Sequence, residues 1–307
     1  MILEAFLLAV ALDLVFGEPA AAYHPVVWIG RLIGFLDRHA PRHFQRLYGL
    51  FLALFCIGAT VIIGYGLTVV LYSISPILSL LATAYLLKST FSFSFLWKVS
   101  KEIYDELRCG DLGGARSKLP ALVGRDVSKL DEGRMSSCVI ESLGESFVDG
   151  IFAPLFYFIL LGLPGALAYR AINTLDSMVG YKDEKHIKVG MPSARIDDIA
   201  NFIPARLAVL LISAVSVIFG SPLRAIKIAL RDGRNPPSVN SGYPMSAFAG
   251  ALGLRLEKLG YYILGEGLKP SGVDDIPRAI RFNMALSAVL IVLTSIIIYV
   301  TGLPFIQ

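Results

Sequence analysis

Residues Leu47–Leu87 read LYGLFLALFCIGATVIIGYGLTVVLYSISPILSLLATAYLL, an apolar run of about forty residues interrupted near Gly64–Gly66 and Ser73–Pro76. One membrane crossing needs roughly 20 consecutive apolar residues, so the run is long enough for two. It predicts a helical hairpin with spans over 47–65 and 67–87 and a tight turn between them.

The composition of the whole chain agrees with a membrane location. Of 307 residues, 55% are hydrophobic and only 17% are charged, and the mean hydropathy is +0.65, too apolar for an ordinary soluble globule. The net charge of +4 is small, and the basic residues are interspersed with acidic ones rather than arranged as a stripe. We therefore expect the lipid bilayer as a partner and no nucleic acid.

Three further segments are apolar. Residues 202–220 and 284–302 are long enough to cross a membrane. Residues 1–16 contain Glu4 and Asp13 and lack the basic start and small-residue cleavage site of a signal peptide, so we expect them to be retained.

A fourth segment, 151–169, is hydrophobic but interrupted by Pro154, Gly162, Pro164 and Gly165. A bent or re-entrant helix is as compatible with such a segment as a clean span. The sequence thus predicts an all-α, multi-pass integral membrane protein, with about four to six membrane-associated helices and one domain over residues 1–307.

Four polar stretches separate the apolar segments: 17–46, 88–150, 170–201 and 221–283. All four carry Lys and Arg, which favours the cytoplasmic side for each of them. Simple alternation of spans would place 170–201 on the opposite side. The conflict disappears if 151–169 enters and leaves on one side and 202–220 does the same or lies along the interface. We expect all four stretches to face the cytoplasm.

Acidic residues in the second stretch recur at helical spacing. Glu141, Glu145 and Asp149 are separated by four residues each, so a helix would place them on one face. A solvated surface face is one explanation. The other is a divalent-cation site, because carboxylate oxygens suit Mg²⁺ bridged to substrate phosphates.

Two more polar clusters follow. Asn173, Asp176, Ser177 and Gly180 share a helical face, and the charged residues that begin at Lys182 come directly after them. Packing through small residues is the structural alternative to a site, because a polar face beside two apolar segments costs stability unless it is paired or ligated.

The next cluster lies where an apolar helix begins. Asp197 and Asn201 stack at i and i+4, Asp198 lies on an adjacent face, and Arg195 and Arg206 flank them. These charges either neutralise one another or form a second metal or phosphate subsite, in which the arginines grip phosphate oxygens bidentately.

Two turn-rich stretches complete the polar inventory. His24 precedes Pro25, where a histidine is either structural or functional, and the loop 231–244 contains Asn240 among prolines and glycines. The chain has no GxxxxGK[ST], GxSxG or HExxH motif. Acids, amides and arginines remain, the set expected for metal-assisted phosphate chemistry.

Taken together, motifs along nearly the whole chain resemble the CobD/CbiB family of cobalamin biosynthesis. The motifs are Leu12-Asp13-Leu14, Gly17-Glu18-Pro19, His24-Pro25-Val26, Gly124-Arg125-Asp126, Glu141-Ser142 through Asp149-Gly150, Ala153-Pro154-Leu155-Phe156-Tyr157, Asn173 through Tyr181, and Ala194 through Arg206. The resemblance implies a membrane enzyme that joins adenosylcobyric acid through an amide bond to (R)-1-aminopropan-2-ol O-phosphate or a related aminoalcohol phosphate.

The resemblance also implies ATP and Mg²⁺ as co-substrate and metal, with a role for each motif residue. Asp176, Glu145 and His24 are the catalytic candidates, and Glu141, Asp149, Asp197 and Asp198 are the metal candidates. The candidates for binding phosphates, the corrin or the nucleotide are Arg125, Lys182, Arg195, Arg206, Asn173, Asn201 and Asn240. A homo-oligomer and association with other late corrin-pathway enzymes are both compatible with the family.

The sequence departs from the family pattern in two places. Ser146 stands where relatives usually have Asn, and Pro236 and Val239 replace residues of a His-Pro-Ser-Pro-Asn loop that a Glu normally follows. The departures leave open a changed aminoalcohol, reduced activity or a non-catalytic scaffold.

Two other classes are weaker. A membrane phosphotransferase would need the continuation of Asp149-Gly150 that is missing here, and a transporter would need charges inside the spans, whereas here the charges lie outside them.

Overall fold

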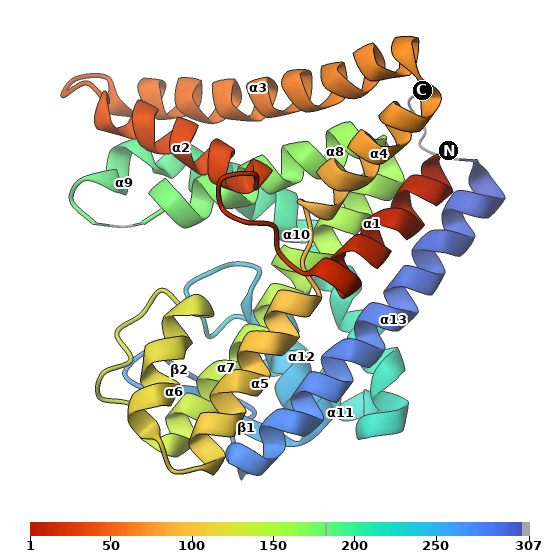
Figure 1. Cartoon of the computed structure of the whole chain (residues 1–307). Helices are drawn as coiled ribbons and strands as arrows, with labels where there is room; N and C mark the ends of the chain where they lie inside the picture. The colour runs from red at the N-terminus through yellow and green to blue at the C-terminus, as the bar shows by residue number, and fades with distance from the viewer. Residues whose placement is uncertain (182, 303–307) are drawn as a thin grey trace. The chain divides into compact units, whose positions relative to one another are not determined.

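A computed structural model gives the fold of residues 1–181 and 183–302. The chain divides into two compact units, each drawn from separate parts of the sequence (Figure 1). Unit 1 comprises Met1–Ser92, Ala153–Asn201 and Val292–Gln307, and unit 2 comprises Phe93–Phe152 and Phe202–Ile291. Neither unit is a contiguous stretch, and the single membrane domain over 1–307 stays a prediction.

Among the residues that the structure describes, unit 1 contains helices and no strand. Its helices are α1 (Ile2–Phe16), α2 (Pro25–Arg38), α3 (Gln45–Ile74), α4 (Pro76–Lys88), α8 (Ala153–Val179), α9 (His186–Val189), the start of α10 (Met191–Phe219) and the end of α13 (Ile276–Thr301). Helix α3 packs on α2, α4 and α8, and α1 packs on α4. The core between α2, α3 and α8 is apolar and includes Ile33, Leu52 and Leu175.

The hairpin predicted from Leu47–Leu87 is present, but its turn is not at Gly64–Gly66. Helix α3 continues through both glycines to Ile74, and the chain turns at Ser75 before Pro76 begins α4. Gly64 serves packing, because a Cβ there would lie 2.6 Å from Leu167 Cδ1 of α8. Proline suits the first turn of a helix and disfavours helix in the residue before it, so Pro76 sets the boundary.

The interrupted segment 151–169 is broken within α8. Gly162 has φ 66° and ψ −155°, a non-helical conformation, and Pro164 follows it. A left-handed φ is readily adopted by glycine, so the sequence permits a break here. Of the alternatives left open by the sequence, the structure has a bent helix, while re-entry on one side of the membrane stays a prediction.

Unit 2 combines helices with a small sheet. Its elements are α5 (Ser94–Arg108), α6 (Leu112–Lys118), η1 (Leu119–Ala121), α7 (Glu132–Phe147), the π-helical turn η2 (Val148–Phe152), the later part of α10, α11 (Pro222–Asp232), α12 (Gly242–Leu252), β1 (Leu254–Lys258), β2 (Tyr262–Leu264), β3 (Lys269–Pro270), η3 (Val273–Asp275) and the start of α13. Strand β1 lies centrally, antiparallel to β2 and parallel to β3. A mostly helical chain is confirmed, but the sheet within 221–283 was not predicted.

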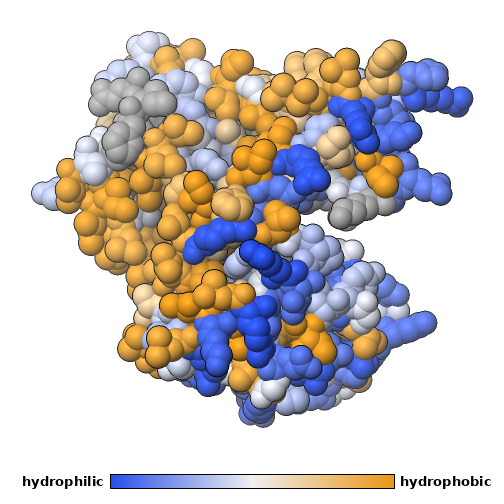
Figure 2. All heavy atoms as spheres, turned by 180° about the vertical axis from the view of Figure 1, so that it is seen from behind, coloured by the Kyte–Doolittle hydropathy of each residue, from blue (hydrophilic) through white to orange (hydrophobic). Residues whose placement is uncertain are grey.

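Four helical segments among the described residues are long and apolar enough to cross a membrane: Gln45–Ile74, Glu132–Val179, Met191–Phe219 and Val273–Thr301. Helix α3 exposes large apolar side chains, among them Ile62 at 72% and Ile63 at 71%. Figure 2 shows how widely apolar side chains cover one face of the surface. These helices indicate a multi-pass membrane protein, because only a bilayer makes such exposure favourable.

Candidate active site

The first polar cluster lies in unit 2 and is centred on Glu141, which is only 3% exposed. Its Oε1 accepts a hydrogen bond from the Ser137 hydroxyl (2.9 Å), and its Oε2 accepts one from Tyr262 (3.0 Å) and lies 3.6 Å from Arg125 Nη2. We call Arg125, Ser137, Glu141 and Tyr262 the Glu141 cluster. The predicted metal ligand Glu141 and the predicted phosphate ligand Arg125 are thus paired with each other.

The pKa values of Arg125 and Tyr262 are both shifted by their charged neighbours in this cluster. Burial alone would lower the pKa of the Arg125 guanidinium, but the neighbouring Glu141 carboxylate raises it above its ordinary value. Burial and the negative charges of Glu141 and Glu145 raise the pKa of the Tyr262 phenol. Tyr262 therefore stays protonated and acts as a donor to the carboxylate.

The three acids predicted to share a helical face are separated by a change in helix type. Glu141 and Glu145 lie on α7, and their charges interact, whereas Asp149 lies in the π-helical turn that follows. A π-helical turn adds residues per turn and so shifts Asp149 from the face that regular α-helix would give it. Glu145 and Asp149 are half-buried.

A surface cavity of about 530 Å³ opens beside Tyr262 in the same unit, and Lys258 lines it. Lys258 Nζ lies 4.9 Å from the centre of the Tyr261 ring, a cation–π contact. Sequence reasoning missed Ser137, Lys258 and Tyr262. The two strand residues lie more than a hundred positions after Glu141, and no local pattern connects them to it.

Arg206 binds the loop that precedes α12. Its guanidinium donates to Asn240 Oδ1 (2.5 Å) and to the Val239 carbonyl (3.1 Å), and it stacks on the rings of Phe202 and Tyr243. The candidates Arg206 and Asn240 contact each other, and Arg206 holds the loop that contains Asn240.

The second polar cluster lies in unit 1, at the start of α10. Asn201, 2% exposed, accepts a hydrogen bond from Tyr169 (2.8 Å) and donates one to Asp197 Oδ2 (3.0 Å). Tyr157 stacks on Tyr169 at 5.4 Å and donates to the Ala200 carbonyl. These contacts fix Asn201 and orient Asp197, and we call Tyr169, Asp197 and Asn201 the Asn201 cluster.

Asp198 and Arg195 form an ion pair of 3.6 Å at the surface, where Arg195 is 72% exposed. Such exposed pairs contribute about 0–1 kcal/mol, so Arg195 can exchange Asp198 for another anion at little cost. The charge of Asp198 also acts on Asp176, near the end of α8. In unit 1 the candidates Asp176 and Asp198 are therefore close enough for their charges to interact.

The carboxylate of Asp176 lies against the backbone of Gly180. A Cβ added at Gly180 would collide with Asp176 Oδ1. Asn173, one turn earlier on α8, is half-buried. The candidate Lys182 lies outside the described residues.

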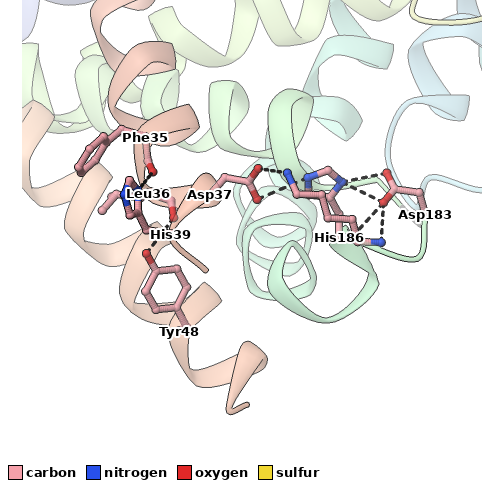
Figure 3. A network of polar contacts seen from close by, with 8 residues as sticks. Phe35, Leu36, Asp37, His39, Tyr48, Asp183 and His186 are labelled. Atoms are coloured by element: carbon pink, nitrogen blue, oxygen red, sulfur yellow. Dashed lines mark hydrogen bonds and ion pairs between the residues drawn. The ribbon is translucent and has the colours of Figure 1, made fainter. Parts of the chain in front are cut away.

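The segment after Gly180 is tied to the end of α2 (Figure 3). His186 Nδ1 lies 2.9 Å from Asp183 Oδ2, and its Nε2 lies 3.5 Å from Asp37 Oδ1, which Lys185 also contacts. The hydrogen bonds from His186 lower the pKa of the Asp183 carboxyl. This network anchors residues Asp183–His186 to the end of α2.

His24 lies in a buried charge network in unit 1. Its Nδ1 caps α2 by accepting from the Val26 N–H, so the proton is on Nε2, which donates to Glu18 Oε2 (2.7 Å). Lys88, 2% exposed, donates to the same oxygen (2.8 Å) and lies 3.3 Å from the fully buried Asp13. Both ring nitrogens of His24 are therefore occupied by protein groups.

Glu18 gives this network a pH dependence. Burial favours its neutral form, but hydrogen bonds from His24, Lys88 and Ser92 outweigh burial and lower the pKa of Glu18 to about 2. Because the pKa is depressed on folding, the stabilisation is complete above about 4.5, the ordinary value, and disappears as the pH falls toward 2.

We expect the melting-temperature difference between the parent protein and Glu18→Gln, measured in detergent, to be constant from pH 7 to about 5.5 and to shrink below about 4.5. Glu184→Gln removes an exposed acid of the same unit and serves as the control. A difference that stays constant down to pH 3 would contradict the role given to the Glu18 carboxylate.

The acidic residues of the two units would suit a metal ion that takes most of its ligands from the substrate phosphates. Within residues 1–181 and 183–302, no three His, Cys, Asp or Glu side chains are grouped to hold a metal ion. Mg²⁺ is commonly bound by one or two carboxylates together with substrate phosphates. Glu141 in unit 2, and Asp176 with Asp198 in unit 1, are acids that could supply that smaller set of ligands.

Comparison with known proteins identifies the family. The family model described as CobD/Cbib protein matches residues 6–290. A probable cobalamin biosynthesis protein CobD of Methanothrix thermoacetophila is 41% identical, with the alignment covering 95% of this chain and 99% of that protein. The cobalamin biosynthesis protein CobD of Dehalococcoides mccartyi is 39% identical, covering 93% and 92%, and CbiB of Salmonella choleraesuis is 38% identical, covering 95% and 96%.

No solved structure matches the chain with significance. The family match spans motif residues of both units, from Asp13 and Glu18 to Arg206 and Asn240. The chain belongs to the CobD/CbiB family of cobalamin biosynthesis proteins.

Proposed function

We propose that this protein is an amide-forming ligase that joins adenosylcobyric acid to (R)-1-aminopropan-2-ol O-phosphate, or a related aminoalcohol phosphate, to give adenosylcobinamide phosphate. The observation that carries the proposal is the match of residues 6–290 to a cobalamin biosynthesis family. Its chemistry needs an activated carboxylate and neutralised phosphates, and each unit offers acids and a cation: Asp198 and Arg195 in unit 1, and Glu141 and Lys258 in unit 2.

ATP with Mg²⁺, when bound, would supply the phosphoryl group that makes a carboxylate oxygen of the corrin a leaving group. Glu141 in unit 2, or Asp176 with Asp198 in unit 1, would hold the metal. Arg195, at the surface, and Lys258, at the cavity, are the cations we assign to phosphates, because neither is in a buried ion pair.

Glu145 is the carboxylate we assign to accept the proton of the incoming amine, since it is half-buried beside Glu141. His24, Arg125 and Arg206 receive positioning roles instead of direct ones. Each of them is occupied by protein groups: Glu18, Glu141 and Asn240 respectively.

The test uses the purified full chain in detergent with adenosylcobyric acid, Mg-ATP and either aminopropanol phosphate or ethanolamine phosphate. Mass spectrometry should detect the amide product with at least one amine and only when ATP is present. Absence of product with both amines would overturn the ligase and favour a non-catalytic scaffold.

Gly180→Ala should lower kcat about tenfold or more, because the added methyl group would collide with Asp176 Oδ1 and lie 2.6 Å from the Asp176 carbonyl oxygen, so it displaces both the carboxylate and the end of α8 without removing the charge. The matched control is Gly58→Ala on α3, where the new methyl group meets no atom within 4 Å. Equal activity in the two variants would mean that the position of the Asp176 carboxylate does not affect catalysis.

We also propose that the polar stretches 17–46, 88–150, 170–201 and 221–283 face the cytoplasm, which the positive-inside rule supports. A cysteine introduced at Glu184, in a chain whose exposed Cys109 has been replaced by Ser, should react with an impermeant reagent only after the cells are opened. Labelling from outside intact cells would contradict the arrangement.

A further inference from the structure

The turn between α2 and α3 concentrates positive charge at the start of a membrane-spanning helix. Residues 38–46 read RHAPRHFQR, with three arginines, two histidines and no acidic residue. Helix α3 then continues for 30 residues with enough apolar length to cross a bilayer. The charge therefore lies at one end of a candidate span.

The arginines of this turn are not neutralised within the protein. Arg38, Arg42 and Arg46 are exposed, and none forms a hydrogen bond or ion pair with another described residue. Asp37 is the nearest acid in sequence, but Figure 3 shows it directed toward His186, and it also pairs with Lys185. The positive charge of the turn is left for an external anion.

Apolar side chains are exposed beside these arginines. Phe44 is 82% exposed, Leu47 67% and Phe51 52%. They line a shallow cavity of about 400 Å³ together with Pro41, Arg42, His43 and Tyr48. Exposed aromatic and basic groups at the end of a span are typical of the membrane–water interface.

Phe44 is held in this position by the backbone. It has φ 56°, the only positive φ at a non-glycine residue that the structure describes. A bulky residue rarely adopts this conformation, and it costs energy. Tyr48, one turn later, donates to the Leu36 carbonyl (2.9 Å) and so ties α3 to the end of α2 (Figure 3). The turn is thus a defined surface.

We propose that the α2–α3 turn binds the headgroup of an anionic phospholipid. The phosphate contacts Arg42, which lines the cavity and whose guanidinium suits phosphate oxygens bidentately, and the exposed charges of Arg38 and Arg46 at the two ends of the turn add to the attraction. The glycerol and first acyl carbons pack on Phe44, Leu47 and Phe51. A small soluble anion would contact only the basic part of the cavity and leave its apolar part exposed. A lipid, which has both an anionic headgroup and acyl chains, can contact both parts. The site is independent of the proposed ligase activity.

The test is native mass spectrometry of the full chain in detergent, titrated with phosphatidylglycerol or with phosphatidylcholine of the same acyl chains. We expect phosphatidylglycerol to bind at least about tenfold more tightly, because each Arg near an anionic headgroup adds several-fold in affinity. In the triple variant R38Q/R42Q/R46Q the two lipids should bind within about twofold of each other.

The control K98Q/K129Q/K227Q removes three exposed positive charges elsewhere and should keep the preference. A second variant, Phe44→Asn, keeps the arginines and suits the positive φ, and it should weaken phosphatidylglycerol binding severalfold.

Four results would overturn the site: no lipid preference in the parent chain, an equal loss in the control, unchanged affinity in Phe44→Asn, or displacement of the lipid by equimolar glycerol phosphate. The last result would show a site for small anions.

Discussion

Glu141→Gln should reduce the rate of amide formation by about 10²–10³-fold, the usual effect of removing one electrostatic group from an active site. The amide keeps the shape of the carboxylate, but it has a single oxygen and so can accept only one of the two hydrogen bonds from Ser137 and Tyr262. It removes the charge that pairs with Arg125 and, in the proposed mechanism, with Mg²⁺. Rates measured by product mass test this expectation.

Loss of the charge should also destabilise the fold. A partly buried guanidinium left without its counter-charge can cost as much as about 3–5 kcal/mol, so the melting temperature of Glu141→Gln should fall. The double variant R125Q/E141Q removes both charges and should recover most of that stability without recovering activity. Recovery of activity in the double variant would mean that Glu141 serves only to neutralise Arg125.

Glu132→Gln is the matched control for this experiment. It makes the same chemical change on the same helix α7, at an exposed residue. Its rate and melting temperature should equal those of the parent protein.

Asp176→Asn should abolish turnover, again by about 10²–10³-fold, while the melting temperature in detergent stays near that of the parent protein. The substitution preserves shape, and the carboxylate beside Gly180 has Asp198 as a like-charged neighbour. Because Asp176→Asn removes one of two repelling charges, it should not destabilise the fold. A loss of activity would therefore come from a loss of catalysis and not from unfolding. Glu184→Gln, an exposed acid in the following segment, is the control, and retained activity in Asp176→Asn would remove Asp176 from the site.

The membrane-spanning helices were predictable because length and apolarity are local properties of a sequence. Segments 202–220 and 284–302 lie within or overlap α10 and α13. The turn of the hairpin was placed wrongly because Gly64 and Gly66 resemble a loop signal. Gly64 is there to admit Leu167 of α8, a contact that only the folded chain reveals.

The polar clusters were predictable only in part. Motif spacing identified Glu141, Asp176 and Asn201, but not their partners Tyr262 and Tyr169, which come from distant strands and helices.

Lys88 was read as the first residue of a polar stretch, yet it is buried between Asp13 and Glu18. Asp13 carried a usable signal, since an acid in an apolar segment requires a partner. The partner's identity depends on the packing of α1 against α4, which no local pattern encodes.

In the proposed reaction, this chain itself joins a corrin carboxylate to an amine and consumes ATP. The direct measurement uses adenosylcobyric acid whose reacting carboxylate carries two ¹⁸O atoms. Each amide formed should retain one ¹⁸O, and the other should appear in the released inorganic phosphate. Absence of the amide, or amide formed without ¹⁸O in the phosphate, would contradict the account.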